Sequence, residues 1–185
     1  HAELLRAQER IMAVLLKKGI PLIVSTKAVV PDRFVALFRD YSGLVQVHVG
    51  MNTLDDEVRR VIEPRAAPVQ ARLDNLARLA NARVPAALRI DPMIPGLTDG
   101  GQQLSELVRA AADCGACRVI GSHLFLRRSH RWPKGIRFGA WSYESMVRQH
   151  YTCKLDGYCS GGSVMLVPPD YRLAKYQCLR DLGAA

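Results

Sequence analysis

The sequence lacks the features that mark membrane and secreted proteins. Although 49% of its 185 residues are apolar, no apolar run is long enough to cross a bilayer. The first turn, from Ala2 onward, has no apolar core of the kind that a secretory signal peptide needs. Cysteine is scarce and odd in number, at five residues, which argues against a disulfide framework. These absences predict a globular protein of the reducing cytoplasm with enough chain for a real core.

Acidic residues are also few. The 17 Asp and Glu residues face 26 Lys and Arg residues, which gives a formal net charge of +9. This excess favours an anionic partner such as nucleic acid, although charge governs association and not fold. The composition points to no membrane partner, and it leaves the oligomeric state open. The chain begins with His1 instead of Met, and we expect further sequence upstream of it.

The stretch from Ile20 to Lys27 organises our interpretation of the chain. It is short, apolar and rich in β-branched residues, and it ends abruptly in two hydroxyls and an amine. Its length and composition predict one fully buried strand. In parallel α/β proteins, ligands bind at the carboxyl ends of the strands. We therefore expect the chemistry of this protein at the edge where Lys27 lies.

Strands and helices alternate along the first two thirds of the chain. The predicted strands span residues 20–27, 44–50, 86–90 and 118–125. Helices are predicted from Leu4 to the break at Gly19, over 32–40, 69–82 and 102–114, and after a helix N-cap at 53–56. Such alternation requires parallel pairing with right-handed crossovers. The predicted fold class is α/β, either part of a β/α barrel or an open doubly wound sheet.

The alternation stops after Phe125, where a basic loop begins. Residues 127–137 contain no acid, and their basic and aromatic side chains suit phosphate contact plus base stacking. A solvated surface loop would have the same composition. The predicted nucleic-acid-binding residues are Arg127, Arg128, Arg131, Trp132, Lys134 and Arg137. A helix over 142–151, a Gly/Ser-rich turn, a strand over 164–167 and a terminal helix after Pro169 are expected to follow.

Residue groups at successive strand ends resemble the radical S-adenosylmethionine (SAM) superfamily, in its spore photoproduct lyase-like branch. These groups are Ser25-Thr26-Lys27, residues 47–53, Glu63-Pro64-Arg65-Ala66 with Arg72-Leu73, and residues 91–96. The resemblance covers residues 4–125. It implies that residues 1–126 are a partial radical SAM β/α barrel containing its third to sixth strands. Residues 127–185 would form a mixed extension packed on the same domain.

The resemblance also implies a chemistry. Family members use a 4Fe-4S cluster to cleave SAM reductively to methionine and a 5′-deoxyadenosyl radical, which abstracts hydrogen from the substrate. By analogy with the spore photoproduct lyase-like branch the substrate would be DNA or another nucleic acid, and a flavodoxin or ferredoxin would donate the electron. The family binds its cluster with a C-x-x-x-C-x-x-C triad, and no three cysteines here have that spacing. We expect the cluster ligands upstream of His1 and no activity from this chain alone.

Eight residues occupy positions that the family uses around SAM, and no catalytic residue is assigned. They are Ser25, Lys27, Gly50, Asn52, Arg72, Asp91, Met93 and Ile94. The resemblance implies that Lys27, beside Ser25, binds the methionine carboxylate. It implies that the Asn52 amide bonds ribose or methionine groups. Gly50 stands where the branch has a serine, so one hydroxyl contact is missing.

The remaining positions would form the wall of the cofactor site. The resemblance implies an internal ion pair between Glu63 and Arg72, and apolar contact of Met93 and Ile94 with adenine. Each assignment has a structural alternative. Lys27 could simply extend from a strand end into solvent, the ion pair could be purely structural, and the proline-rich loop after Asp91 could be rigid without binding a ligand.

The cysteines and histidines predict no metal site. Cys114 and Cys117 form a C-x-x-C, which is typical of a redox pair or half a metal site, but their place at a helix end favours a packing role. The tail cysteines Cys153, Cys159 and Cys178 match no cluster pattern. His48 and His123 have no acidic partner at ligand spacing.

Two other functions stay open beside a radical SAM enzyme acting on nucleic acid. One is a different β/α-barrel enzyme that binds a phosphorylated metabolite through Lys27. Against it, no strand here ends in the Gly-rich phosphate cradle that such sites use. The other is a nucleic-acid-binding module without catalytic activity.

Overall fold

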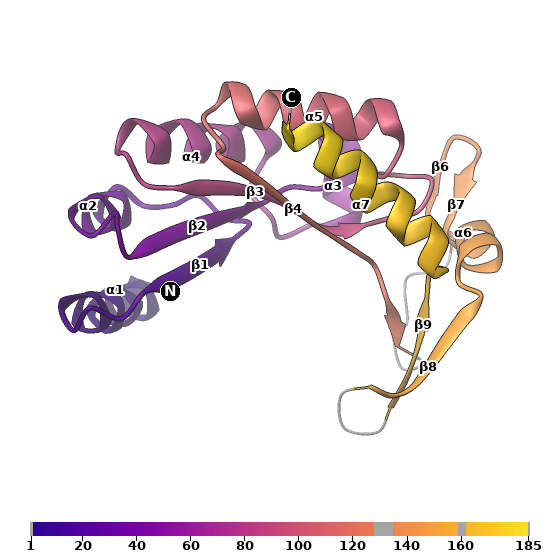
Figure 1. Cartoon of the computed structure of the whole chain (residues 1–185), viewed down its shortest axis with the longest axis horizontal. Helices are drawn as coiled ribbons and strands as arrows, with labels where there is room; N and C mark the ends of the chain where they lie inside the picture. The colour runs from indigo at the N-terminus through magenta and orange to yellow at the C-terminus, as the bar shows by residue number, and fades with distance from the viewer. Residues whose placement is uncertain (1, 128–134, 159–161, 185) are drawn as a thin grey trace.

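The computed structural model describes residues 2–127, 135–158 and 162–184 of the chain. Its first part alternates between helices and strands as the sequence predicts (Figure 1). These elements are α1 (Ala2–Lys17), β1 (Leu22–Thr26), α2 (Asp32–Asp40), β2 (Val45–Gly50), α3 (Asp56–Ile62), α4 (Val69–Asn81), β3 (Ala86–Met93), α5 (Gly101–Asp113) and β4 (Arg118–His123).

The four strands form one parallel sheet in the order β1-β2-β3-β4. In this register, Val24 of β1 pairs with Val47 of β2, and Val49 pairs with Leu88 of β3. All four carboxyl ends therefore lie at the same edge, and the predicted parallel α/β sheet is confirmed.

Helices cover one face of this sheet, where the main hydrophobic core lies. Every second residue of β2, namely Val45, Val47 and Val49, is buried in this core. Leu76 and Leu79 of α4 pack against the same strands and are fully buried. Figure 1 shows α2, α4, α5 and α7 on the same side of the sheet. The residues between the core positions, such as His48, therefore face the opposite, concave side.

The prediction that the first strand is fully buried is wrong. Side chains of β1 alternate between exposed and half-buried, and Ile23 is 68% exposed. The physical reason is position, because within the described residues β1 pairs only with β2 and forms the edge of the sheet. An edge strand keeps apolar residues on one face while its other face meets solvent.

Several element ends differ from the sequence prediction, and two of these differences lie near the strand-end edge. The N-cap of α3 is Asp55, whose carboxylate accepts hydrogen bonds from the amides of Glu57 and Val58. Thr53 accepts instead from the Asp55 amide and forms the turn before the helix. Strand β3 continues past Ile90 to Met93, because an irregularity between these two residues keeps it paired with β4.

The tail contains more strands than the single one that the sequence predicts. Its elements are β5 (Leu126–Arg127), β6 (Arg137–Phe138), β7 (Trp141–Ser142), α6 (Tyr143–His150), β8 (Cys153–Tyr158), β9 (Gly162–Leu166) and α7 (Pro169–Ala184). Two antiparallel sheets result, β5-β9-β8 and β6-β7. Helix α7 returns to the parallel sheet, where Leu179 joins the main core. None of the described helices is both long enough and apolar enough to span a membrane.

Candidate functional site

A hollow of about 240 Å³ lies where the carboxyl ends of β1, β2 and β3 meet. Its lining is Ser25, Thr26, Lys27, His48, Gly50, Arg89 and Asp91. Four of the eight predicted cofactor-binding residues are thus brought together at one place. The parallel sheet explains this convergence, because it aligns the strand ends at a single edge.

A carboxylate whose side chain is only 9% exposed, that of Glu63, organises the groups beside this hollow. Its Oε1 accepts a hydrogen bond from Lys27 Nζ at 2.5 Å and another from Asn52 Nδ2 at 2.9 Å. Its Oε2 accepts from Arg72 Nη1 at 3.0 Å. The structure therefore contains the predicted Glu63–Arg72 ion pair and adds two further partners. We call Lys27, Asn52, Glu63 and Arg72 the Glu63 cluster.

The local structure fixes each member of the Glu63 cluster. Glu63 is the C-cap residue of α3, and Arg72 lies on α4 with its Nη1 donating to the Gly50 carbonyl at 2.7 Å. The turn after Lys27 is held by Asn75, which accepts from the Val30 amide and donates to the Ala28 carbonyl. The backbone segment that directly follows Lys27 is thus fixed by hydrogen bonds at Ala28 and at Val30.

The Glu63 cluster has one more positive than negative charge, and it leaves donors unused. Arg72 is fully buried, and within the described residues its Nε and Nη2 have no hydrogen-bond partner. Burial lowers the pKa of Arg72, and the Glu63 carboxylate opposes that shift. The Oδ1 atom of Asn52 is likewise buried and unpartnered among described groups. Buried polar atoms without partners carry a free-energy cost.

Asp91 and its neighbours form the far wall of the hollow. The Asp91 carboxylate accepts from Ser122 Oγ at 2.5 Å and from Arg89 Nε at 3.0 Å, while its backbone carbonyl accepts from Lys27 Nζ at 2.8 Å. Burial by itself would raise the pKa of Asp91, but the Ser122 and Arg89 hydrogen bonds outweigh it and the pKa is lowered. Asp91 therefore stays ionised and already has partners for both carboxylate oxygens.

His48 is a lining residue that the sequence did not predict. It is 6% exposed, and neither ring nitrogen has a partner within the described residues. Burial, followed by the charges of Arg89 and Arg118, lowers its pKa, so the imidazole is neutral at pH 7. Arg89 was missed in the same way, whereas Thr26 belonged to the Ser25-Thr26-Lys27 group but not to the predicted cofactor-binding residues. Strand alternation was the available signal, because Arg89 and Asp91 must face the same side as their neighbour His48.

Met93 and Ile94 lie away from the hollow. Met93 is buried in the main core, and Ile94 is buried in a second core beneath the tail. The loop that follows is fixed by Trp141, whose Nε1 donates to the Pro95 carbonyl at 2.9 Å, and by Gly96, whose φ of +71° suits glycine. Contact of Met93 and Ile94 with a ligand thus stays a prediction that their burial does not favour.

A second buried carboxylate, Asp99, joins this loop to the C-terminal helix. Asp99 Oδ1 accepts from the Gly96 amide, and Oδ2 accepts from the Tyr171 hydroxyl, both at 2.8 Å. Lys175 Nζ donates to the Asp99 carbonyl at 2.7 Å. His123 Nε2 lies 3.7 Å from Asp99 Oδ2, too far for a hydrogen bond. We call Asp99, His123, Tyr171 and Lys175 the Asp99 cluster.

The cysteines do not assemble a metal centre in the part of the chain that is described. There, no three or more His, Cys, Asp or Glu side chains are placed to hold a metal ion. Cys114 and Cys117 are free thiols, and Cys117 Sγ contacts the Ala86 carbonyl at 3.2 Å. Burial raises the pKa of Cys114. Cys159 lies outside the described residues.

The predicted nucleic-acid-binding loop is only partly described. Arg127 and Arg137 are exposed, and the Arg127 guanidinium lies 5.7 Å from the centroid of the Phe125 ring. The other four predicted residues, Arg128, Arg131, Trp132 and Lys134, lie outside the described residues. The two described arginines are therefore available to solvent and to an anionic partner.

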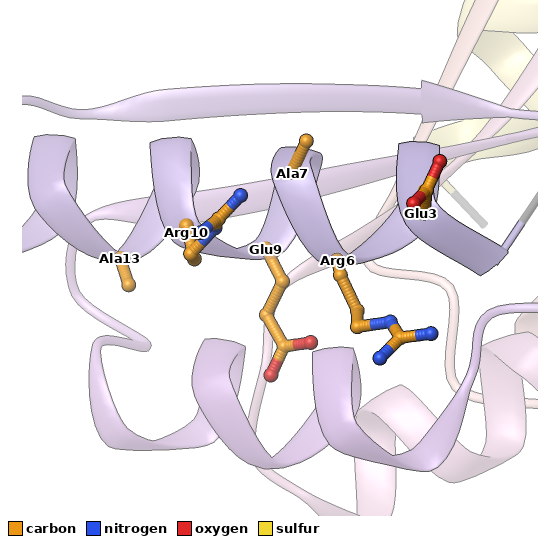
Figure 2. Close-up of a pocket in the computed structure, with 6 residues that line it drawn as sticks. All are labelled: Glu3, Arg6, Ala7, Glu9, Arg10 and Ala13. Atoms are coloured by element: carbon orange, nitrogen blue, oxygen red, sulfur yellow. The ribbon is translucent and has the colours of Figure 1, made fainter.

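A larger hollow, of about 750 Å³, runs along α1, but its lining suits no chemistry. Its residues are Glu3, Arg6, Ala7, Glu9, Arg10 and Ala13, all from this one helix (Figure 2). Figure 2 shows Arg6 and Glu9 extending to one side of the helix, and Glu9 pairs with Arg33 of α2 at 2.9 Å. Because no second element contributes to the lining, no groups converge on a ligand, and we assign no site here.

Comparison with known proteins assigns the family. A model of the radical SAM superfamily matches residues 2–109. An uncharacterized protein of Mycobacterium tuberculosis is 27% identical over 186 residues, which is 89% of this chain and 55% of that protein. An uncharacterized protein of Acidianus two-tailed virus is 26% identical over 128 residues, which is 68% of this chain and 42% of that protein.

Two solved structures share the fold. Spore photoproduct lyase complexed with dinucleoside spore photoproduct has a TM-score of 0.65 at 15% identity, over 88% of this chain and 47% of that one. A mutant of spore photoproduct lyase with bound AdoMet and dinucleoside spore photoproduct has a TM-score of 0.62 at 13% identity. This chain spans about half the length of these relatives. The fold is confirmed as a partial radical SAM barrel, and the protein belongs to the radical SAM superfamily.

Proposed function

We propose that this chain is the part of a radical SAM enzyme that binds the methionine end of SAM in the strand-end hollow. The observation that carries the proposal is the Glu63 cluster, where Lys27 and Arg72 leave one positive charge in excess beside an open space of about 240 Å³. A carboxylate is the ligand group that such donors prefer. Lys27 is the accessible cation, with its side chain 39% exposed.

The residues fit SAM better than they fit the iron–sulfur cluster. Lys27 would hold the carboxylate, and the Asn52 amide would bond a ribose or methionine group. Glu63 accepts a hydrogen bond from each of these two side chains, and Arg72 in turn holds Glu63. Ser25, at the exposed rim, would add a hydroxyl. The sequence has no C-x-x-x-C-x-x-C triad, and we propose that the cluster ligands lie in a part of the whole protein outside this sequence.

The whole enzyme would cleave SAM reductively to methionine and a 5′-deoxyadenosyl radical for hydrogen abstraction. The reduced cluster supplies the electron for this step when it is bound. The role of the chain is to hold the cofactor in place and to keep the wall of the site rigid. Expression of a longer gene product under anaerobic conditions, followed by measurement of iron content and 5′-deoxyadenosine, tests this activity. A longer product without iron and without 5′-deoxyadenosine would contradict it.

Binding of SAM by the chain itself is the first test. Calorimetric titration should give saturable binding, and Lys27→Met should weaken it roughly 10- to 100-fold, because a hydrogen bond to a charged group is lost. Decarboxylated SAM should bind the wild type as weakly as SAM binds Lys27→Met. The exposed Lys18 at the end of α1 provides the control, Lys18→Met, with unchanged affinity. Equal affinity for SAM and its decarboxylated form would sink the assignment.

We further propose that the substrate is DNA or another nucleic acid. The net charge of +9, the exposed Arg127 and Arg137, and the fold shared with a lyase bound to a dinucleoside photoproduct support this class. Each phosphate contact should appear in the salt dependence of binding.

Fluorescence anisotropy of a labelled oligonucleotide at several salt concentrations tests the substrate class. The double variant Arg127→Ala and Arg137→Ala should reduce the slope of log affinity against log salt by about two. A matched variant, Arg39→Ala with Arg180→Ala, removes two exposed arginines on other elements and should keep the slope. Equal effects of the two double variants would mean non-specific charge attraction only.

A further inference from the structure

The side chain of Lys27 crosses a whole strand. Lys27 follows Thr26, which pairs with Val49 of β2, so Lys27 stands beside Gly50. Gly50 in turn pairs with Arg89 of β3. Yet Lys27 Nζ donates to the Asp91 carbonyl on β3 at 2.8 Å. The ammonium of an edge-strand residue thus lies beside the third strand of the sheet.

The crossing is possible because position 50 has no side chain. A Cβ atom on Gly50 would lie 2.7 Å from Lys27 Cγ and 2.9 Å from Lys27 Cε. Carbon atoms in contact normally stay about 3.5–4.0 Å apart. The backbone itself does not demand glycine here, since Gly50 is not among the residues with positive φ. Space for Lys27 is therefore the physical reason for glycine at this position.

We propose that Gly50 is a positioning residue that routes Lys27 across β2 and so places the cation between β2 and β3. In this chain a side chain at position 50 would overlap the present path of Lys27, so that the ammonium would lose its contacts with Glu63 and the Asp91 carbonyl. Gly50 thereby determines where a ligand carboxylate binds along the strand-end edge. The identity of that ligand rests on the proposed function, whereas the route of Lys27 does not.

The displaced group would be Lys27 and not the strand. The two atoms that a new Cβ would meet belong to a flexible side chain, which can rotate away, whereas no other heavy atom of the described residues is as close. An ammonium has three donors, and Lys27 uses two of them, on Glu63 and on the Asp91 carbonyl. One donor is left for a ligand, and all three would be misplaced after the side chain moves.

Competitive acylation of the lysines, read by mass spectrometry, tests the route without any ligand. An ammonium held by two acceptors must leave both before its nitrogen reacts. In Gly50→Ala and Gly50→Ser, labelling of Lys27 should rise about tenfold relative to the other lysines, as expected for loss of a hydrogen bond to a charged group. Gly43→Ala is the matched control, because a Cβ there meets nothing within 4 Å. Unchanged labelling of Lys27 in both Gly50 variants would overturn the proposal.

A double-mutant cycle extends the test to SAM. Gly50→Ala should weaken binding to the level of Lys27→Met, and adding it to Lys27→Met should cost nothing more. Urea unfolding provides the same cycle for stability. Gly50→Ala should lower the unfolding free energy of the wild type, but it should not lower that of the Lys27→Ala variant. Additive effects in the unfolding cycle would contradict the route of Lys27. If the wild type did not bind SAM but Lys27 labelling still rose in the Gly50 variants, the proposed function would be refuted. The proposed route of the Lys27 side chain across β2 would stand.

Discussion

The Glu63 and Asp99 clusters are both built around a buried carboxylate, but they differ in what they leave unsatisfied. Asp99 is 1% exposed, and each of its oxygens accepts a hydrogen bond from a neutral donor. Glu63 accepts from two cations and an amide, next to a hollow, while Arg72 keeps two donor nitrogens without described partners. We call the Asp99 cluster closed because its carboxylate is satisfied, although both ring nitrogens of His123 have no partner within the described residues. The Glu63 cluster instead keeps cationic donors that can bind a further carboxylate.

This difference separates anchoring from binding. The Asp99 cluster joins the loop after β3 to α7, which carries Tyr171 and Lys175, and so holds the C-terminal helix on the barrel. The Glu63 cluster joins β1, β2, α3 and α4 at the strand ends, where ligands of parallel sheets bind. A carboxylate with a hydrogen bond to each oxygen stabilises a fold, whereas cationic donors without partners beside a pocket favour binding of an anionic group.

The largest effect is expected for Arg72→Met in the Glu63 cluster. The change keeps an apolar side chain of similar length but leaves Glu63 without its buried cation and the Gly50 carbonyl without a donor. Removing one partner of a buried pair costs roughly 3–5 kcal/mol. Urea unfolding followed by circular dichroism measures the loss. Arg60 on α3, which forms an exposed ion pair with Glu57, supplies the control. Arg60→Met should change the unfolding free energy by less than about 0.5 kcal/mol.

A ligand that carries a carboxylate should distinguish the two clusters further. SAM at saturating concentration should raise the midpoint of thermal unfolding of the wild type, because it binds only the folded state. The same addition should have no effect on Arg72→Met, whose site has lost its excess positive charge because Glu63 then neutralises Lys27, while a variant of the Asp99 cluster should respond like the wild type. A response of Arg72→Met equal to that of the wild type would remove the basis for calling the Glu63 cluster a binding site.

Asp99→Asn is expected to have an intermediate and pH-dependent effect. Burial alone would raise the pKa of Asp99, but its His123, Gly96 and Tyr171 neighbours lower it overall. A carboxylate whose folded pKa lies below the unfolded value of about 3.9 stabilises the fold above that pH, and the contribution disappears as pH falls through the folded pKa. The variant should therefore lose about 2 kcal/mol at pH 7 and much less at pH 3. A difference that is independent of pH would contradict the role of the charge.

The sequence predicted which residues meet at the carboxyl ends of the strands, but it did not predict the paths that their side chains take. Ser25, Lys27, Gly50 and Asp91 could be placed together because parallel strands align their carboxyl ends. The crossing of Lys27 over Gly50 depends on the register between β1 and β2, which no local pattern specifies. His48 was missed as a lining residue because the alternation of side chains was not used to find which residues of β2 and β3 share a face of the sheet.

The tail was the less predictable part, for physical reasons that its residues show. In strand β8 the apolar–polar alternation of Cys153-Lys154-Leu155-Asp156 covers only four residues before Gly157, which is the shortest run that indicates a strand. In the Asp99 cluster, Asp99 contacts Tyr171 and Lys175, which lie 72 and 76 positions after it in the sequence. Contacts of that separation depend on the final fold, and a single sequence gives no sign of them.

The smallest effect is expected for Tyr171→Phe, which removes one hydroxyl from the closed cluster. Burial and the Asp99 charge raise the pKa of Tyr171, so the phenol stays protonated and donates to Asp99 Oδ2 at neutral pH. The ring itself stays in the variant, together with its contact to Lys175 Nζ at 5.3 Å from the centroid. A single neutral donor is worth about 1 kcal/mol, so the unfolding free energy should fall by that amount while the affinity for SAM stays unchanged. A loss of SAM affinity in Tyr171→Phe would show that the two clusters are coupled and that the closed one also shapes the site.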